Sequence, residues 1–247
     1  MDVSWIIPTY RDELRIEQTL RDVDRHLLSL SLPGGHEIVV VSSTAGDRTP
    51  TIVEQLARDM PAVRLLKVEG HGKGSSVRHG MLAATGAIRV FSDADNATAP
   101  AHFDLTMPLF RRGLQVVVGS RSPRDAAGAC RNVDESPLRR VCGTLGNVYV
   151  RLATGTRLRD TQNGFKAFTA AAADDLFNRL TIAGFAFDVE ILLLARLREY
   201  GIGAIPVDWR HDPHTSVTPA AYAEVMRDVT LMGLNRLTGK YRDVHGH

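Results

Sequence analysis

Ile88-Arg89-Val90-Phe91-Ser92-Asp93-Ala94-Asp95 is a short, largely apolar run that ends in two carboxylates. In extended chain, residues two apart project to the same side, so Asp93 and Asp95 can face one point. That point lies just beyond the carboxyl end of a strand, where open α/β sheets bind their ligands. Paired carboxylate oxygens suit Mg²⁺ or Mn²⁺ shared with a diphosphate. The alternative interpretation is a solvated acidic turn.

Segments typical of strands and of helices alternate on both sides of this run. Apolar and mostly β-branched runs predict strands at 3–8, 37–41, 63–68, 88–91 and 114–119. Apolar residues at helical spacing predict helices at 16–27, 49–60 and 74–85. This alternation predicts an α/β fold with a twisted, mostly parallel sheet that is flanked by helices in a single domain.

The second half of the chain is less regular. Residues 122–137 are polar and small, which predicts a mobile surface loop. Helical character resumes at 138–152, 185–200 and 220–237, and 202–209 is predicted to be a late strand. We expect one domain over residues 1–242, with a tail at 243–247.

Composition excludes several classes of protein. The chain has 247 residues, 44% of them hydrophobic, and a formal charge of +2, so no bulk field favours nucleic acid. Cys130 and Cys142 lack metal-site spacing and argue against a disulfide scaffold. No signal-peptide pattern and no apolar run near the ~20 residues of a membrane span is present. We therefore expect a cytoplasmic protein, which would meet any lipid substrate at the inner membrane surface.

Two further motifs point to nucleotide binding. After the first predicted strand, Tyr10, Asp12 and Glu13 offer an aromatic ring and carboxylates to a nucleoside, although a helix start with acidic residues is the alternative. Lys73 lies among glycines at a predicted helix start, where a phosphate contact is plausible and a flexible loop is the alternative. Because Gly74 follows Lys73, this is not a Walker loop.

Basic and sugar-binding residue types are scattered along the second half. Guanidinium groups bind phosphate in a bidentate manner, and the candidates are Arg121, Arg139, Arg140, Arg210 and His211. The run from Asp160 to Phe165 has the Asp, Gln and Asn side chains that bind sugar hydroxyls. Asp188 and Glu190 begin an apolar helix, where complementing the helix dipole is the alternative interpretation.

Taken in order, these motifs resemble family 2 glycosyltransferases of the GT-A fold. The nearest subgroup is the polyprenyl-phosphate sugar transferases of the dolichyl-phosphate β-glucosyltransferase type. The resemblance extends from about Val3 to Tyr241. It rests on Ile7-Pro8-Thr9-Tyr10, Lys73-Gly74 with Val77-Arg78 and Gly80-Met81, Asp93-Ala94-Asp95, Val118-Gly119-Ser120-Arg121, Asp160-Thr161-Gln162-Asn163-Gly164-Phe165-Lys166, Phe185-Ala186-Phe187-Asp188-Val189-Glu190 and Val207-Asp208-Trp209-Arg210-His211.

The resemblance implies a role for each matching residue. Residues 1–120 would bind the nucleotide sugar, and 121–242 the acceptor. The nucleotide would be bound by Pro8, Tyr10, Asp12, Ser42, Asp47, Lys73, Asp93 and Ala94. Asp93 and Asp95 would hold Mg²⁺ or Mn²⁺. Phosphate would be contacted by Arg121, Arg139, Arg140, Arg210 and His211. The sugar would be contacted by Gln162, Asn163, Gly164, Asp188 and Glu190. Catalysis would fall to Asp95, Asp188 and Arg121.

Two departures from the family pattern bear on the substrates. The run Ser42-Ser43-Thr44-Ala45 replaces an Asp-Asp-Gly-Ser pattern, so a carboxylate that reads the base is missing. A UDP-sugar is the favoured donor, and a cytidine donor stays open. His214-Thr215-Ser216-Val217 replaces a Ser-Lys-Val ending, which removes a lysine that would face the acceptor phosphate.

The reaction that the resemblance implies is an inverting, metal-dependent transfer of a hexose to a polyprenyl phosphate. One alternative keeps the fold and uses a soluble small-molecule acceptor, and another is a non-catalytic module that binds sugar nucleotides. A nucleotidyltransferase would need a glycine-rich loop after the first strand, which Pro8-Thr9-Tyr10-Arg11 does not provide. The last helix combines apolar and basic residues, so it can contact an anionic membrane or pack on the core.

Overall fold

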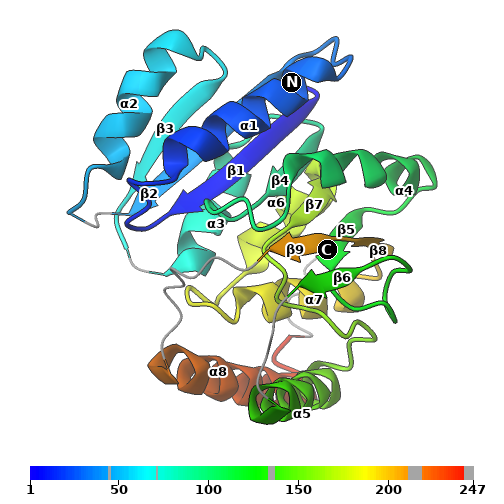
Figure 1. The fold of residues 1–247 in the computed structure, drawn as a ribbon. Helices are drawn as coiled ribbons and strands as arrows, with labels where there is room; N and C mark the ends of the chain where they lie inside the picture. The colour runs from blue at the N-terminus through cyan, green and yellow to red at the C-terminus, as the bar shows by residue number, and fades with distance from the viewer. Residues whose placement is uncertain (44–45, 71, 133–136, 211–218, 242–247) are drawn as a thin grey trace.

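The computed structural model describes residues 1–43, 46–70, 72–132, 137–210 and 219–241, and Figure 1 shows their arrangement. The strands are β1 (Val3–Thr9), β2 (His36–Ser43), β3 (Val63–Val68), β4 (Ile88–Phe91), β5 (Val116–Ser120), β6 (Cys130–Asn132), β7 (Lys166–Thr169), β8 (Ile202–Pro206) and β9 (Asp208–Arg210). The helices are α1 (Ile16–Ser29), α2 (Thr49–Asp59), α3 (Lys73–Ala83), α4 (Met107–Arg111), α5 (Pro137–Thr154), α6 (Ala170–Arg179), α7 (Phe187–Leu197) and α8 (Pro219–Leu237), with a 3-10 helix η1 (Pro100–Leu105).

The main sheet has seven strands in the order β3-β2-β1-β4-β7-β5-β8. All of its pairs are parallel except those of β7, which runs antiparallel to both β4 and β5. The chain leaves β1 to one side for β2 and later returns to the other side for β4, so the order reverses at β1. In open α/β sheets such a switch point opens a crevice at the carboxyl ends of the two strands.

Both faces of the sheet are apolar, which explains the unbroken hydrophobic runs of its strands. In β2, Ile38 and Val40 pack in the cluster that contains α1 and α2, whereas Val39 and Val41 pack in the cluster that contains α3. The predicted apolar stripe of α1 is buried as expected, at Ile16, Leu20, Val23 and Leu27. The predicted α/β class, with a mostly parallel sheet in a single domain, is confirmed.

A second layer of helices lies outside α7. Helix α7 is buried along most of its length, and α5 and α8 lie side by side beyond it, at the bottom of Figure 1. The Tyr149 hydroxyl and the Thr230 hydroxyl are 2.6 Å apart across the α5–α8 seam. Close by, Gly233 allows Ala153 to approach, because a Cβ there would lie 3.3 Å from the Ala153 Cβ.

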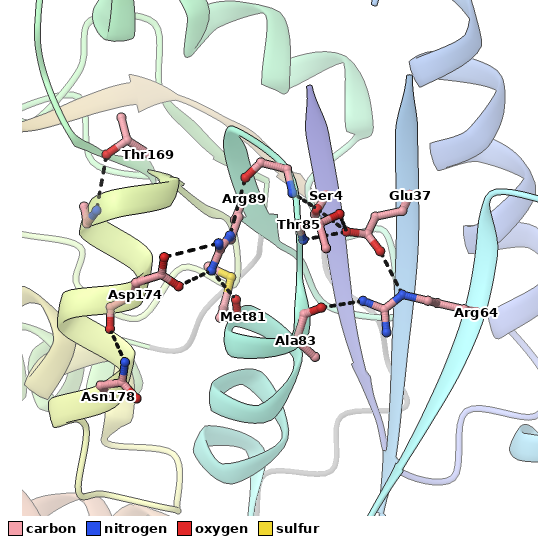
Figure 2. A network of polar contacts seen from close by, with 12 residues as sticks. Ser4, Glu37, Arg64, Met81, Ala83, Thr85, Arg89, Thr169, Asp174 and Asn178 are labelled. Carbon is pink, nitrogen blue, oxygen red and sulfur yellow. Dashed lines mark hydrogen bonds and ion pairs between the residues drawn. The ribbon is translucent and has the colours of Figure 1, made fainter. Parts of the chain in front are cut away.

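A polar network joins the amino ends of β1, β2 and β3 (Figure 2). The Glu37 carboxylate accepts hydrogen bonds from Ser4 Oγ at 2.6 Å, Thr85 N at 2.7 Å and Arg64 Nε at 2.8 Å. Burial opposes ionisation of Glu37, but these donors outweigh it and lower its pKa from 4.5 to about 2. The network ties β1, β2 and β3 to the segment that follows α3.

Several features differ from the sequence predictions. η1, α4, β7 and α6 were not predicted. The 122–137 segment, predicted as a loop, contains β6, which pairs in parallel with β9. The predicted strand 202–209 divides at Val207, so that β8 joins the main sheet and β9 joins β6. In the described residues, no helix is both long and apolar enough to cross a membrane.

Candidate active site

Charged side chains meet at the carboxyl ends of β1 and β4, beside the start of α3. Lys73 Nζ, in the first turn of α3, lies 2.5 Å from Asp93 Oδ1. Gly164 packs directly against the same carboxylate, and a Cβ at this position would collide with Asp93 Oδ2. The structure therefore brings the predicted residues Lys73, Asp93 and Gly164 together from three separate motifs.

Asp95 lies two residues after Asp93, in the turn that follows β4. Its Oδ1 accepts a hydrogen bond from Ala97 N at 3.0 Å, which turns the chain tightly after β4. Burial raises the pKa of the Asp95 carboxyl, and the negative charge of Asp93 raises it further. Two carboxylates this close repel each other, which favours a cation bound between them.

The donor set fits a divalent ion that shares its ligands with a substrate. Two carboxylates supply hard oxygens, and Mg²⁺ is commonly held by one or two carboxylates together with substrate phosphates. Among the described residues, no group of three or more His, Cys, Asp or Glu side chains could hold a metal ion. A cation at Asp93 and Asp95 would therefore take its remaining ligands from a diphosphate and water.

A second ion pair, which is buried and formed by Lys166 and Asp188, adjoins Lys73. Lys166 Nζ lies 2.5 Å from Asp188 Oδ1 and donates to the Asn163 carbonyl at 2.8 Å. Burial raises the pKa of Asp188 although Lys166 and Lys73 oppose this, and burial lowers the pKa of Lys166 although Asp188 opposes it. Because Lys73 interacts with both Asp93 and Asp188, positive and negative groups alternate through the site.

Lys73 itself stays charged. Burial disfavours its ammonium form, but Asp93, Asp188 and Asp95 outweigh this and raise its pKa. Its backbone is held close to the loop before α7. A Cβ on Gly72, which has a φ of +110°, would collide with the Ala183 carbonyl, and a Cβ on Gly74 would collide with the Ile182 carbonyl. Only glycines fit this close contact between the two loops.

Arg121 and Asp160 form a bidentate pair at the end of β5. Arg121 Nε and Nη2 each donate to the Asp160 carboxylate at 2.7 Å, and Arg121 N donates at 2.8 Å. The guanidinium also lies over the Trp209 ring, 5.3 Å from its centroid. Burial alone would raise the pKa of the Asp160 carboxyl, but Arg121 outweighs burial and lowers that pKa. The pair therefore stays ionised.

The residues predicted to bind the nucleoside lie around Asp12. This buried carboxylate accepts from Tyr10 N at 2.8 Å and from Arg15 Nε at 2.7 Å, which fixes the turn after β1. Burial raises the pKa of the Asp12 carboxyl, although the hydrogen bonds from Tyr10 and Arg15 oppose this. The Tyr10 ring is exposed, and the Arg11 guanidinium lies 5.4 Å from its centroid.

Other predicted nucleotide residues line the same strand ends. Pro8 lies in β1 beside Val41, and Ser42 is the residue before the last in β2, with its hydroxyl donating to the Ser43 carbonyl. Ala94 is buried between the two acidic residues, and its carbonyl accepts a hydrogen bond from Thr19. Asp47 accepts from Thr49 through one oxygen, whereas its other oxygen is buried without a hydrogen-bond partner in the described structure.

The predicted sugar-contacting residues divide into two environments. Asn163 is buried, and its Nδ2 has no hydrogen-bond partner in the described residues, whereas Gln162 is exposed. Glu190 is buried away from Asp188. Its oxygens accept from Thr181 Oγ1 at 2.6 Å, Ile182 N at 2.8 Å and Tyr241 Oη at 3.1 Å. Its contact with a sugar stays a prediction, and its observed contacts hold the loop before α7.

Some predicted residues cannot be placed as side chains. Arg139 and Arg140 lie in α5 and Arg210 ends β9, but their side chains lie outside the described part of the structure, as does all of His211. Sequence reasoning assigned no role to Lys166, Arg15 or Trp209, which the structure brings to the site. For Lys166 a signal existed, because a lysine inside the apolar run Phe165-Lys166-Ala167-Phe168 predicts a buried charge with a partner.

Comparisons with known proteins indicate one family. Residues 4–172 match the family described as "Glycosyl transferase family 2". The dolichyl-phosphate beta-glucosyltransferase of Drosophila melanogaster is 31% identical, over 98% of this chain and 77% of that protein. The protein of the same name from Dictyostelium discoideum is 29% identical, over 97% of this chain and 76% of that protein.

Solved structures with the same fold include two synthases. Glucosyl-3-phosphoglycerate synthase from Mycobacterium tuberculosis, in complex with Mn²⁺, UDP-glucose and phosphoglyceric acid, superposes with a TM-score of 0.65 at 19% identity, covering 95% of this chain and 79% of its own. Mannosyl-3-phosphoglycerate synthase from Rubrobacter xylanophilus gives a TM-score of 0.67 at 16% identity, covering 98% of this chain and 75% of its own. The predicted GT-A fold is thereby confirmed.

Proposed function

Because the chain belongs to glycosyl transferase family 2, we propose that it transfers a hexose from a nucleoside-diphosphate sugar to a polyprenyl phosphate. The observation that carries the proposal is the set of Lys73, Asp93, Asp95 and Asp188 at the switch point of the sheet. UDP is the favoured nucleotide. The acceptor follows from the relatives named above, which share sequence along nearly the whole chain.

The first half of the chain would bind the donor. The Tyr10 ring and the Asp12 turn would face the nucleoside, and Ser42 would stand near the base. Asp93 and Asp95 would hold Mg²⁺ or Mn²⁺, which when bound neutralises the departing diphosphate. Lys73 adds a fixed positive charge beside Asp93, 2.5 Å from its Oδ1, and so supports the same leaving group.

The transfer would be a single displacement with inversion. An oxygen of the acceptor phosphate forms the new bond to the anomeric carbon as the bond from that carbon to the donor diphosphate breaks. A phosphate monoester with a second pKa of about 6 is largely ionised near neutral pH, so no strong base is needed. Asp188 would orient the sugar, because Lys166 Nζ fixes its carboxylate at 2.5 Å. For a hydroxyl acceptor, Asp188 would instead be the base.

The second half of the chain would bind the acceptor. Arg121 uses Nε and Nη2 for Asp160, at 2.7 Å each, and Nη1 then remains to contact a phosphate. Arg139, Arg140, Arg210 and His211 are further candidates for that phosphate. Since the proposed acceptor is a lipid, we place the protein in the cytoplasm at the inner face of a membrane.

The test is direct transfer of label. The full chain is incubated with radiolabelled UDP-glucose, GDP-mannose or a CDP-sugar, a polyprenyl phosphate in detergent, and Mg²⁺, Mn²⁺ or a chelator. We expect label in the organic phase with one donor and with a metal, and an inverted anomeric configuration by NMR. Asp95→Asn should abolish transfer, whereas Asp104→Asn, an exposed carboxylate on η1, should not.

Other results would reject parts of the proposal. Transfer only to a water-soluble acceptor would replace the lipid phosphate by a small molecule. Donor binding without transfer to any acceptor would favour a sugar-nucleotide binding module. Full activity with chelator, or in Asp95→Asn, would remove the metal from the mechanism.

A further inference from the structure

Glu190 lies in the first turn of α7 and is fully buried. Its Oε2 accepts from Thr181 N at 3.0 Å and Ile182 N at 2.8 Å, and its Oε1 accepts from Thr181 Oγ1 at 2.6 Å and Tyr241 Oη at 3.1 Å. A carboxylate has about four lone-pair sites, so these donors satisfy it. Among the described residues, no cationic side chain forms an ion pair with Glu190.

The contacts of Glu190 go beyond those of a residue that only complements the helix dipole. That role needs no partner outside the helix, and an exposed carboxylate fills it without the cost of burying a charge. Glu190 instead reaches 8 and 9 residues back along the chain, to backbone N–H groups in the segment 180–186 that joins α6 to α7. We call this segment the α7 entry loop. The buried carboxylate fixes its conformation.

The α7 entry loop contacts the first turn of α3. The Ala183 carbonyl accepts a hydrogen bond from Ser75 N at 3.1 Å. A Cβ on Gly72 or Gly74 would collide with carbonyl oxygens of the same loop. N–H groups in the first turn of a helix can bind a phosphate, but that of Ser75 is occupied by the loop. The loop therefore fixes the backbone from which Lys73 projects and leaves the Lys73 side chain to provide the positive charge there.

The end of α8 holds the same loop from another side. Tyr241, which follows α8, is 9% exposed, and its hydroxyl donates to Glu190. Burial raises the pKa of Tyr241, and the negative charge of Glu190 raises it further, so the hydroxyl keeps its proton and stays a donor. Gly184 lets α8 approach the loop, because a Cβ there would lie 2.8 Å from Glu224 Oε1. The loop is thus held between α3, α7 and α8.

We propose that Glu190 is a positioning residue of the donor site, which acts on Lys73 through the α7 entry loop. The loop would hold Lys73 Nζ where it meets the donor diphosphate, beside Asp93. A displacement of about 1 Å, caused by a change outside the site, can cost a factor of about a hundred in rate. The inference rests on the proposed function and deepens it, because it names the contacts that place a cation against the leaving group.

The test is calorimetric binding of UDP with Mn²⁺ to the full chain, without any acceptor. Glu190→Leu removes the acceptors that hold the loop, so we expect UDP binding to weaken about tenfold. Glu190→Gln should keep most of the affinity, because its carbonyl can accept from the two backbone N–H groups while its NH₂ group donates to the two hydroxyls. Unchanged binding in Glu190→Leu would overturn the proposal.

A double variant tests whether Glu190 acts through Lys73. Lys73→Met removes the ammonium group that Glu190 is proposed to place. Glu190→Leu combined with Lys73→Met should therefore bind UDP no more weakly than Lys73→Met alone, because only one interaction is lost. Losses that add in the double variant would show that Glu190 acts on the site by another route, which contradicts the assignment.

A matched control separates positioning from general loss of stability. Glu37 is also a buried carboxylate with several hydrogen-bond donors, but it lies at the amino ends of the strands. Glu37→Leu should lower the stability and leave UDP binding unchanged, measured where circular dichroism shows both variants to be folded. Equal losses of affinity in Glu37→Leu and Glu190→Leu would make instability the cause and remove the positioning role.

A milder variant serves if Glu190→Leu does not fold. Thr181→Val with Tyr241→Phe removes the two hydroxyl donors and leaves the carboxylate with its backbone partners. We expect UDP binding to weaken about threefold. Full affinity in this variant would mean that the contacts of Oε1 do not place Lys73, and the proposal would fail.

The binding assay also keeps failure of this inference distinct from failure of the proposed function. UDP, GDP and CDP are each tested with Mn²⁺ on the unmodified chain. If none binds, the proposed donor site is rejected, and the positioning role with it. If one binds and Glu190→Leu binds it equally well, the donor site stands and only the positioning role of Glu190 is wrong.

Discussion

Asp188 and Glu190 show how much a single residue's environment depends on the helix that carries it. Both begin α7, and the sequence suggested that both contact a sugar. Residues two apart on a helix do not share a face, so Asp188 meets Lys166 whereas Glu190 meets Thr181 and Tyr241. The same spacing in the turn after β4 leaves Asp95 close enough to Asp93 for the charge of Asp93 to raise the pKa of Asp95. Local conformation thus decides which acidic pairs can act as pairs.

Lys166→Met should destabilise the protein strongly. Removing one partner of a buried ion pair leaves an uncompensated charge, which typically costs about 3–5 kcal/mol. The Lys166–Asp188 pair is 1% and 5% exposed at its side chains, so water cannot replace the lost partner. Urea unfolding of the single variants and of Lys166→Met with Asp188→Leu measures this. The double variant should lose less than Lys166→Met alone, and an equal or larger loss would contradict the pairing.

Gly164→Ala should impair donor binding while the fold persists. Its Cβ would collide with Asp93 Oδ2 and would push that carboxylate from its position. We expect at least a tenfold weaker binding of UDP with Mn²⁺ by calorimetry and little change in circular dichroism. Gly146→Ala in α5 is the control, because nothing lies within 4 Å of its Cβ. It should gain up to about 1 kcal/mol from helix propensity. Unchanged UDP binding in Gly164→Ala would mean that Asp93 does not touch the nucleotide.

At the scale of elements, the strands that were predicted are those whose sequence alone decides them. β1 and β2 are long, apolar and buried on both faces. β7 escaped prediction because it has only four residues, begins with a lysine, and is a strand only through pairing with β4 and β5. The division of 202–209 at Val207 likewise depends on β6, a partner distant in the sequence. Long-range pairing, not local propensity, fixes these elements.

Because of Glu37, the free energy of unfolding should depend on pH in the acidic range. Its pKa falls from 4.5 to about 2 on folding, so its contribution is complete above about pH 4.5 and is lost as the pH falls towards 2. That difference in pKa corresponds to about 3 kcal/mol. We expect Glu37→Gln to lower the free energy of unfolding by about this amount at pH 7 and by little near pH 2. A constant difference across this range would exclude ionisation as the cause.

For the molecule as a whole, the sequence motifs predicted which residues gather but not what fills the space between them. Lys73, Asp93, Gly164 and Asp188 come from four motifs and meet at the switch point. The apolar run around Lys166 indicates a buried charge but does not identify Asp188 as its partner, and the Arg121–Asp160 pair joins residues 39 positions apart that no motif connects.

Nucleotides should stabilise the entire fold, since the site joins both halves of the sheet. A ligand that binds only the folded state adds about 2.7 kcal/mol at a hundredfold excess over its Kd. In thermal unfolding with UDP, GDP and CDP, each with and without Mn²⁺, we expect the largest rise in Tm for UDP with metal. An equal rise for CDP would mean that Ser42 has relaxed the choice of base. No rise with any nucleotide would contradict the assigned donor site.

The reversed direction of β7 has a consequence for how the chain folds. β7 pairs Ile88 with Thr169 and Phe91 with Lys166, so the central pairing of the sheet closes a loop of more than seventy residues. Loops of that length close slowly, and pairings of this kind lower the folding rate. The parallel β1–β2–β3 unit can therefore form first, without Lys166 or Gly164 in place. We expect the donor site to be completed after this unit, so a bound nucleotide should slow unfolding and leave the folding rate unchanged.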